Sequence, residues 1–220
     1  MIPASVQANP NFLIQPHRKL VFVGDSITDA GRRDVAAPYG NGFVNMVRNM
    51  LIARYPAHNL TIVNRGVAGN TVREIAARYE QDVIAERPDW VTIMVGINDV
   101  YRQFFGNPLE AVYQFEYQAT LRLLVTRAQN ATHAQVILIS PYMIEPNEKV
   151  ALRRALDVYG DLMAQVAHET KAIYLNSQAE WDRILKVSAT SFWTSDGFHP
   201  YSHGHALLAR LWLNAVGFSL

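Results

Sequence analysis

The chain has 220 residues, which favours a single domain spanning residues 1–220. Half of the residues are hydrophobic and 18% are charged, a composition typical of a globular protein. A formal net charge of +1 argues against binding to nucleic acid or to an anionic membrane surface. The absence of cysteine excludes disulfides, thiolate metal ligands and a cysteine nucleophile.

The N-terminal segment MIPASVQANPNF has neither the basic region nor the apolar region of a signal peptide. No apolar run approaches the roughly 20 residues that a helix needs to cross a bilayer. We therefore expect a cytoplasmic protein that has no contact with a membrane.

Predicted strands and helices alternate along the chain. Short apolar runs rich in β-branched and aromatic residues predict five strands: 20–23, 60–63, 90–95, 136–139 and 172–175. Segments with helical spacing of apolar residues follow them: 43–51, 72–83, 109–128, 150–168, 179–186 and 201–215. Pro200 suits the first position of the last helix. Because neither face of the strands is polar, we expect a five-stranded parallel sheet in a three-layer α/β/α sandwich.

Glycine and polar residues follow the first three predicted strands and precede the last helix. These segments read GDS at 24–26, NRGVAGNT at 64–71, GIND at 96–99 and DGFHP at 196–200. Ligands of parallel sheets bind at the carboxyl ends of the strands. We therefore expect Ser26, Gly69, Asn98, Asp196 and His199 to converge at one edge of the sheet.

These residue types are the ones that acyl transfer requires. A serine hydroxyl such as that of Ser26 is a poor nucleophile until an adjacent base takes its proton. Histidine can take protons near neutral pH, which makes His199 the candidate base, and Asp196 in the same short loop can orient the imidazole. The backbone N–H groups of Ser26 and Gly69 and the amide of Asn98 could stabilise an oxyanion.

Some of these residues also have a purely structural interpretation. Ser26 alone could be a turn residue or a helix N-cap, and Asp99 is better explained as a hydrogen-bonding brace of its loop. A metal site at His199, His203 and His205 is disfavoured, because His203 and His205 would point in different directions on a helix. No nearby acid completes a zinc ligand set. We expect neither a metal nor a cofactor.

The four segments, in this order, resemble the four sequence blocks of the GDSL, or SGNH, hydrolase family. The resemblance covers the chain from about Lys19 to the last helix and implies a flavodoxin-like α/β/α sandwich. It implies that Ser26 is the nucleophile, His199 the base and Asp196 the acid that orients it. Ser26, Gly69 and Asn98 would form the oxyanion hole.

A finer resemblance covers GDSITDAGR, NRGVAGNTVREIAARYEQDVIAERPDW and GINDVYRQF, which are similar to stretches of the bacterial acetylxylan esterase branch. That branch removes acetyl groups from xylan fragments and includes cytoplasmic, homo-oligomeric members. The resemblance therefore implies a serine esterase acting on acetylated xylo-oligosaccharides, and a homo-oligomer.

Four further side chains are candidate substrate contacts. Tyr101 could line the substrate mouth, although the neighbouring Phe104 and Phe105 could equally pack or form a subunit contact. Tyr142, after the fourth strand, leaves the same choice open. Asp25 is either a turn brace or a substrate contact. Trp193 precedes the histidine loop and would line the acyl pocket by resemblance.

Other functions remain as alternatives. The same catalytic residues would serve an acyl-CoA thioesterase, an arylesterase or a lysophospholipase, although the chain has no long insertion that suggests an apolar lid. A carbohydrate-binding protein with a dead site is disfavoured by the intact Ser26, Asp196 and His199. A nucleotide-binding protein is disfavoured because no G-x-G-x-x-G motif follows the first strand and no Walker A lysine is present.

Overall fold

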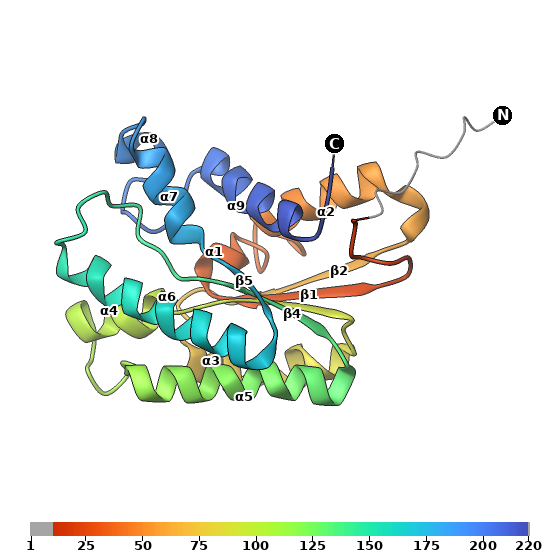
Figure 1. The fold of residues 1–220 in the computed structure, drawn as a ribbon, viewed down its shortest axis with the longest axis horizontal. Helices are drawn as coiled ribbons and strands as arrows, with labels where there is room; N and C mark the ends of the chain where they lie inside the picture. The colour runs from red at the N-terminus through yellow and green to blue at the C-terminus, as the bar shows by residue number, and fades with distance from the viewer. Residues whose placement is uncertain (1–10, 220) are drawn as a thin grey trace.

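A parallel sheet runs through the centre of the molecule in the computed structural model, which describes residues 11–219 (Figure 1). Its strands, in the spatial order β2-β1-β3-β4-β5, are all parallel to their neighbours. Their bounds are β1 (Lys19–Gly24), β2 (Thr61–Gly66), β3 (Trp90–Met94), β4 (Gln135–Ile139) and β5 (Ile173–Leu175). This order is the flavodoxin-like one, so the predicted fold class is confirmed.

Helices cover both faces of the sheet (Figure 1). One layer contains α3 (Val72–Asp82), α4 (Ile97–Phe105), α5 (Gln114–Thr132) and α6 (Ala151–Thr170). The other contains α1 (Ser26–Asp29), α2 (Phe43–Arg54), α7 (Ser177–Leu185), α8 (Thr190–Trp193) and α9 (Ser202–Ala215). The 3-10 turns η1 (Pro56–His58) and η2 (Ile84–Glu86) precede β2 and β3.

Two apolar cores form because successive strand side chains point to opposite faces. On β1, Val21 and Val23 pack with α3, α5 and α6, whereas Leu20 and Phe22 pack with α2 and α9. Trp212 of α9 reaches the sheet and donates a hydrogen bond from Nε1 to Thr92 Oγ1 at 2.9 Å. Both faces of the sheet are therefore buried, as the apolar strands predict.

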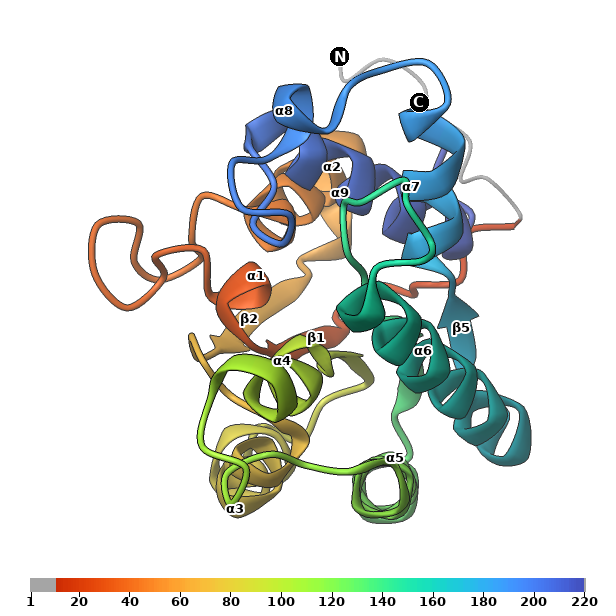
Figure 2. The same ribbon diagram turned by 90° about the vertical axis from the view of Figure 1, so that its left-hand side faces the viewer.

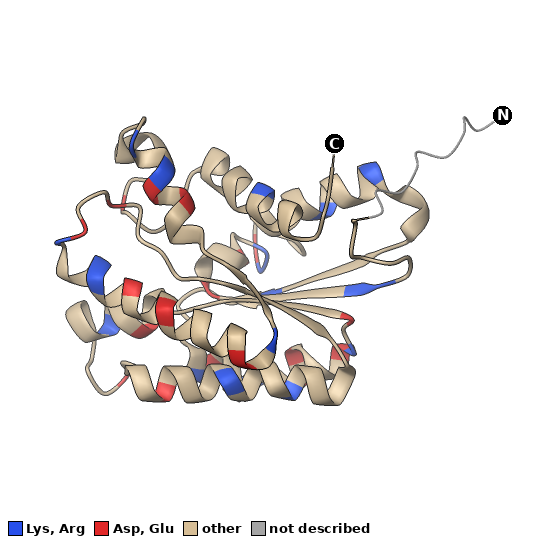
Figure 3. Cartoon of the chain, in the orientation of Figure 1, with Lys and Arg blue, Asp and Glu red and all other residues tan. Residues whose placement is uncertain are grey.

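Acidic and basic residues are mixed over the helices (Figure 3). Several pairs join neighbouring helices of the layer below the sheet in that view: Arg73–Glu116, Arg127–Glu80 and Arg122–Glu169. Exposed pairs of this kind contribute little stability individually, so the apolar cores hold the layers together.

Some predicted element boundaries were wrong. The long helix starts at Gln114, not near residue 109. Helix α9 starts at Ser202, two residues after Pro200, because Pro200 forms an antiparallel bridge with Thr194. That bridge closes the loop that carries His199. Within residues 11–219, no helix combines the length and the hydropathy that a membrane span requires.

Candidate active site

The four sequence blocks meet at the carboxyl edge of the sheet. Strand β1 lies between β2 and β3, and Gly24 is in register with both Gly66 and Met94. The loops after these strands therefore start side by side. Figure 2 looks onto this end of the molecule, where α1 and α4 lie on opposite sides of the strand ends. Strand order changes direction at β1 and β3, where such sheets bind ligands.

Ser26 is the first residue of the short helix α1. The carboxylate of Asp25, the N-cap residue, accepts a hydrogen bond from the Ile27 N–H at 3.0 Å and so fixes the turn after β1. Ser26 Oγ lies 2.8 Å from His199 Nε2. His199 Nδ1 lies 2.6 Å from Asp196 Oδ2. The structure thus brings together the three side chains expected to form a catalytic triad.

The Asp196 carboxylate is held by its own loop. Its Oδ1 accepts hydrogen bonds from the backbone N–H groups of His199 at 2.8 Å and Phe198 at 2.9 Å. Partial burial raises the pKa of Asp196, but the hydrogen bonds from His199 and Phe198 outweigh it and hold this pKa well below its usual range. Asp196 is therefore ionised at neutral pH and can stabilise a protonated His199.

Candidate oxyanion donors come from three different loops. Asn98 donates one amide hydrogen to the Asn70 carbonyl at 3.0 Å, which leaves its second amide hydrogen for a ligand. Gly69 has φ +82°, and its missing side chain would meet nothing within 4 Å. The Gly69 carbonyl accepts a hydrogen bond from Arg102 at 2.8 Å, which fixes the loop. The Ser26 N–H, in the first turn of α1, has no partner within the helix.

A cavity of about 370 Å³ lies over Ser26, Asn98 and the His199 loop, whereas Gly69 is not among the residues that line it. This volume is at the lower end for small-molecule sites. The residues that line it combine the triad with one amide and several apolar side chains: Ser26, Ile27, Ile97, Asn98, Tyr101, Asp196, Phe198 and His199. Tyr101 therefore belongs to the cavity wall, and a reacting ester could reach both Ser26 and Asn98.

Comparison with known proteins identifies the family. Residues 22–207 match the model of the GDSL-like lipase/acylhydrolase family. The chain belongs to this family. A curated relative, an acetylxylan esterase of Geobacillus stearothermophilus, is 42% identical over 207 residues, which cover 91% of this chain and 94% of the relative.

Solved structures of family members superimpose closely. Axe2, an acetylxylan esterase from Geobacillus stearothermophilus, matches with a TM-score of 0.89 and 42% identity, over 94% of this chain and 97% of that chain. LAE5, described as an alpha/beta hydrolase from the metagenome of Lake Arreo, matches with a TM-score of 0.88 and 40% identity, over 94% and 98%. Other matched structures are catalytic mutants of Axe2 in which a serine, an aspartate or a histidine is replaced by alanine.

Three expected substrate contacts lie outside the cavity of this GDSL-family site. Tyr142 is fully buried, with its ring 5.3 Å from that of Trp181, so its burial contradicts a role at the substrate mouth. Trp193 donates from Nε1 to Ser188 Oγ at 2.7 Å and does not line the cavity. Asp25 is 1% exposed and is absent from the cavity lining, and its carboxyl group braces the turn by accepting the Ile27 N–H.

Two buried carboxyl groups flank the site. Burial raises the pKa of Asp25 to about 7, although the hydrogen bond from the Ile27 N–H acts to lower it. Burial raises the pKa of Asp99 to about 8, and the nearby Asp25 adds to this shift. Asp99 Oδ1 accepts a hydrogen bond from the Val72 N–H at 3.0 Å, at the start of α3. The first turn of α4 is thereby tied to the start of α3, as expected of a brace.

Sequence analysis missed Arg78, which connects the strand ends under the site. From α3 its guanidinium donates to the carbonyls of Gly24 at 3.3 Å and Arg65 at 2.8 Å. It also donates to Asn70 Oδ1 at 2.8 Å. The helical pattern shows Arg78 only as a polar position, and nothing in the sequence signals that it reaches back to the sheet.

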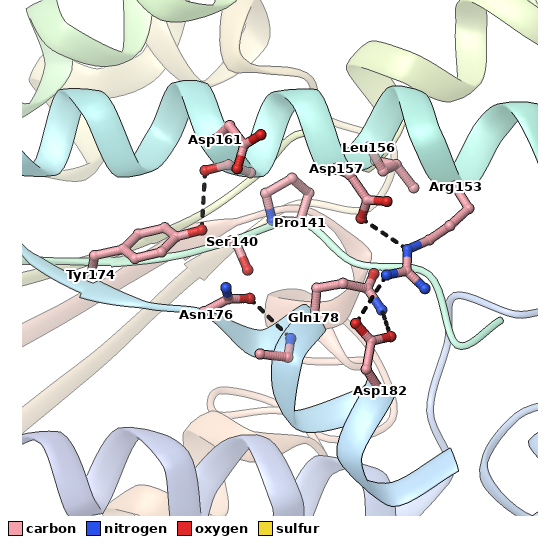
Figure 4. A pocket seen from close by; sticks show the side chains of 12 residues that line it. Ser140, Pro141, Arg153, Leu156, Asp157, Asp161, Tyr174, Asn176, Gln178 and Asp182 are labelled. Atoms are coloured by element: carbon pink, nitrogen blue, oxygen red, sulfur yellow. Dashed lines mark hydrogen bonds and ion pairs between the residues drawn. The ribbon is translucent and has the colours of Figure 1, made fainter. Parts of the chain in front are cut away.

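A second hollow, of about 200 Å³, lies between α6 and α7 at the ends of β4 and β5 (Figure 4). Arg153 lines one side of this hollow, and its side chain is 3% exposed and pairs with Asp157 at 2.8 Å and Asp182 at 3.0 Å. The Tyr174 hydroxyl donates to the Gly160 carbonyl, and Asn176 Oδ1 accepts from the Ala179 N–H. These polar groups satisfy one another, and the lining contains neither histidine nor a base beside its serine.

The histidines of α9 have structural partners. His203 donates from Nε2 to the Phe192 carbonyl, and His205 Nδ1 accepts from the Phe43 N–H at 3.3 Å. Among residues 11–219, no three histidine, cysteine, aspartate or glutamate side chains are grouped to hold a metal ion.

Proposed function

We propose that this GDSL-family member is a serine esterase that removes short acyl groups, and specifically acetyl groups from xylo-oligosaccharides. The observation that carries the proposal is the chain of contacts from Ser26 to His199 at 2.8 Å and from His199 to Asp196 at 2.6 Å. The substrate class is supported by the acetylxylan esterases among the relatives. The residue types altered in the Axe2 catalytic mutants agree with Ser26, Asp196 and His199.

In the proposed mechanism, Ser26 Oγ attacks the ester carbonyl carbon while His199 Nε2 takes the serine proton. Asp196 stabilises the imidazolium that forms. The N–H groups of Ser26 and Gly69 and the amide of Asn98 donate hydrogen bonds to the oxyanion. His199 then protonates the departing alcohol, which leaves an acetyl group on Ser26. Water deprotonated by His199 attacks this acyl group, and acetate is released.

The first experiment compares acetate release from acetylated xylo-oligosaccharides by the wild type and by Ser26→Ala. We expect kcat to fall by about 10⁴-fold or more, because the nucleophile is lost. Ser195→Ala, in the loop of the base, is the matched control and should keep wild-type activity. A Ser26→Ala variant with full activity would refute the proposed nucleophile.

The acyl part of the substrate is tested separately with acetyl and octanoyl esters of one alcohol. We expect a higher kcat/KM for the acetyl ester, because the cavity at Ser26 has a volume of only about 370 Å³. A strong preference for octanoyl would favour the lysophospholipase alternative instead.

We further propose that residues 1–220 act as one domain in a cytoplasmic homo-oligomer, as the resemblance to the acetylxylan esterase branch implies. Light scattering of the purified protein measures its mass in solution. Fractionation of the source cells, with immunodetection, measures where the protein resides.

A further inference from the structure

Four aromatic rings form a continuous series that begins in the active-site cavity. The ring centroids of Phe198 and Tyr101 are 5.9 Å apart, those of Tyr101 and Phe105 are 5.0 Å apart, and those of Phe105 and Phe104 are 6.2 Å apart. Phe198 and Tyr101 both line the cavity that contains Ser26. We call these four residues the aromatic ledge.

The two ledge rings outside the cavity lining, Phe104 and Phe105, are 43% and 66% exposed. Phe198 is half-buried and Tyr101 is 39% exposed. On α4, Asn98, Tyr101 and Phe105 are separated by three and four residues, so they share one face of the helix. This face therefore leads from a candidate oxyanion donor to exposed aromatic surface.

Exposed rings in contact with one another add little to the apolar core and indicate a binding surface when they adjoin a cavity. Aromatic side chains also lose little conformational entropy on binding, because they rotate about only two bonds. The ledge thus offers an exposed aromatic surface beside the nucleophile, in which Tyr101, Phe105 and Phe104 are tilted by 42° and 37° to their neighbours.

The chemistry of the ledge distinguishes among ligands. None of the residues that line the cavity or form the ledge is Lys or Arg, so nothing there would neutralise the phosphates of an acyl-CoA. Rings this exposed would leave one side of an extended acyl chain in water. A pyranose ring, in contrast, has an apolar C–H face that can stack and hydroxyl edges that remain hydrated.

We propose that the aromatic ledge binds a pyranose ring of the acetylated oligosaccharide face-on and so directs the acetyl group to Ser26. This inference rests on the proposed function, and it assigns Phe105 and Phe104 as residues that select a sugar-linked ester over a small one. Phe105 lies outside the cavity lining, so its removal should leave the chemical step intact.

The test compares Phe105→Ala with the wild type on two substrates, acetylated xylotriose and ethyl acetate, which has no ring to stack. We expect KM for acetylated xylotriose to rise about threefold to tenfold, with kcat unchanged, because an aromatic contact of ordinary strength is lost. Both parameters for ethyl acetate should stay at the wild-type values. Phe105→Tyr keeps a ring and should restore the lower KM.

Phe115→Ala is the matched control, since Phe115 is 87% exposed on α5 and does not line the cavity. It should leave KM unchanged for both substrates. An unchanged KM of Phe105→Ala for acetylated xylotriose, or an equal change for ethyl acetate, would overturn the ledge proposal. A change of oligomeric mass in light scattering would also overturn it, because Phe105 would then be a subunit contact.

The wild-type data separate the two proposals. If the wild type hydrolyses ethyl acetate but not acetylated xylotriose, the sugar substrate is wrong and the ledge proposal is overturned with it. If the wild type hydrolyses both and only Phe105→Ala behaves unexpectedly, the proposed function stands and the ledge proposal alone fails.

Discussion

Asp196 uses its two carboxylate oxygens for different tasks. Oδ2 faces His199 Nδ1 at 2.6 Å, while Oδ1 accepts backbone N–H groups from the same loop. A carboxylate held in this way fixes which nitrogen of His199 carries the proton and leaves Nε2 free to act on Ser26. The loop therefore determines both the position and the protonation pattern of the base.

Replacing Asp196 tests this division of tasks. In Asp196→Asn the side-chain oxygen can still accept the backbone N–H groups, but the charge that stabilises the imidazolium is lost. We expect kcat for an acetyl ester to fall by about 10⁴-fold with little change in thermal unfolding. Ser195→Ala in the same loop is the control. A loss below tenfold would show that His199 does not depend on Asp196.

We expect replacement of Asn98 to change the kinetics differently from replacement of Asp196. One of its amide hydrogens holds the Asn70 carbonyl at 3.0 Å, and the other is available to the oxyanion. We expect Asn98→Ala to lower kcat by about 10²- to 10³-fold, while KM changes little, because an oxyanion donor acts mainly in the transition state. Steady-state kinetics on the acetyl ester measure this split, with the exposed Asn107→Ala as control. A rise in KM alone would instead assign Asn98 to substrate binding.

At the level of elements, short helices directly after the strands place the site. Helix α1 has four residues and α4 has nine, and each begins within three residues of a strand end. Segments this short show too few turns for a periodic pattern, so the sequence predicts the buried strands better than these helices. The fixed backbone angle of Pro200 favours a helix start, whereas its bridge to Thr194 depends on tertiary context.

Arg78 of α3 provides a prediction for how these elements are held. Its guanidinium joins the carbonyls of Gly24 and Arg65 to the side chain of Asn70, next to the Gly69 loop. We expect Arg78→Ala to lower kcat by about tenfold to 100-fold, because small displacements of reacting groups are costly. The rate of Ser26 labelling by a fluorophosphonate should fall with it.

Arg73→Ala is the matched control for Arg78→Ala. Arg73 lies on the same helix, is 45% exposed and pairs with Glu116 at 2.7 Å on the surface. Its replacement should leave both kcat and labelling unchanged. If the two variants lose activity equally, the effect belongs to the stability of α3 and not to the strand-end contacts.

Across the whole molecule, the convergence of the candidate catalytic residues was predictable from the sequence, whereas the placement of several residues around them was not. Ser26, Asn98 and His199 stand at strand ends or in loops, where residue type and position in a parallel sheet predict convergence. Tyr142 comes after a predicted strand and Trp193 precedes the histidine loop, so the same argument places them near the site. Their rings instead pack against Trp181 of α7. That packing depends on how distant segments of the chain meet, which local sequence does not reveal.

The buried acids Asp25 and Asp99 make the stability of the whole fold depend on pH. Their pKa values of about 7 and about 8 in the folded state exceed the ordinary value of 3.8. Between about pH 4 and pH 7 the folded state therefore holds protons that the unfolded chain releases. The contribution of these two groups to the free energy of unfolding should fall as pH rises through this window, by up to about 1.4 kcal/mol per pH unit for each group, and should level off above about pH 8. His205, whose pKa burial lowers to about 4, contributes in the opposite direction below about pH 6.5.

Asp99→Asn isolates one of these groups. The asparagine oxygen can still accept the Val72 N–H, and the amide carries no charge at any pH in the window. We expect the slope of unfolding free energy against pH between pH 5 and pH 7 to be about 1.4 kcal/mol per pH unit shallower than in the wild type. Urea unfolding at several pH values measures the slope, and the exposed Asp34→Asn should keep the wild-type slope. All other titrating groups are common to the variants, so equal slopes for Asp99→Asn and the wild type would mean that Asp99 is ionised in the folded protein.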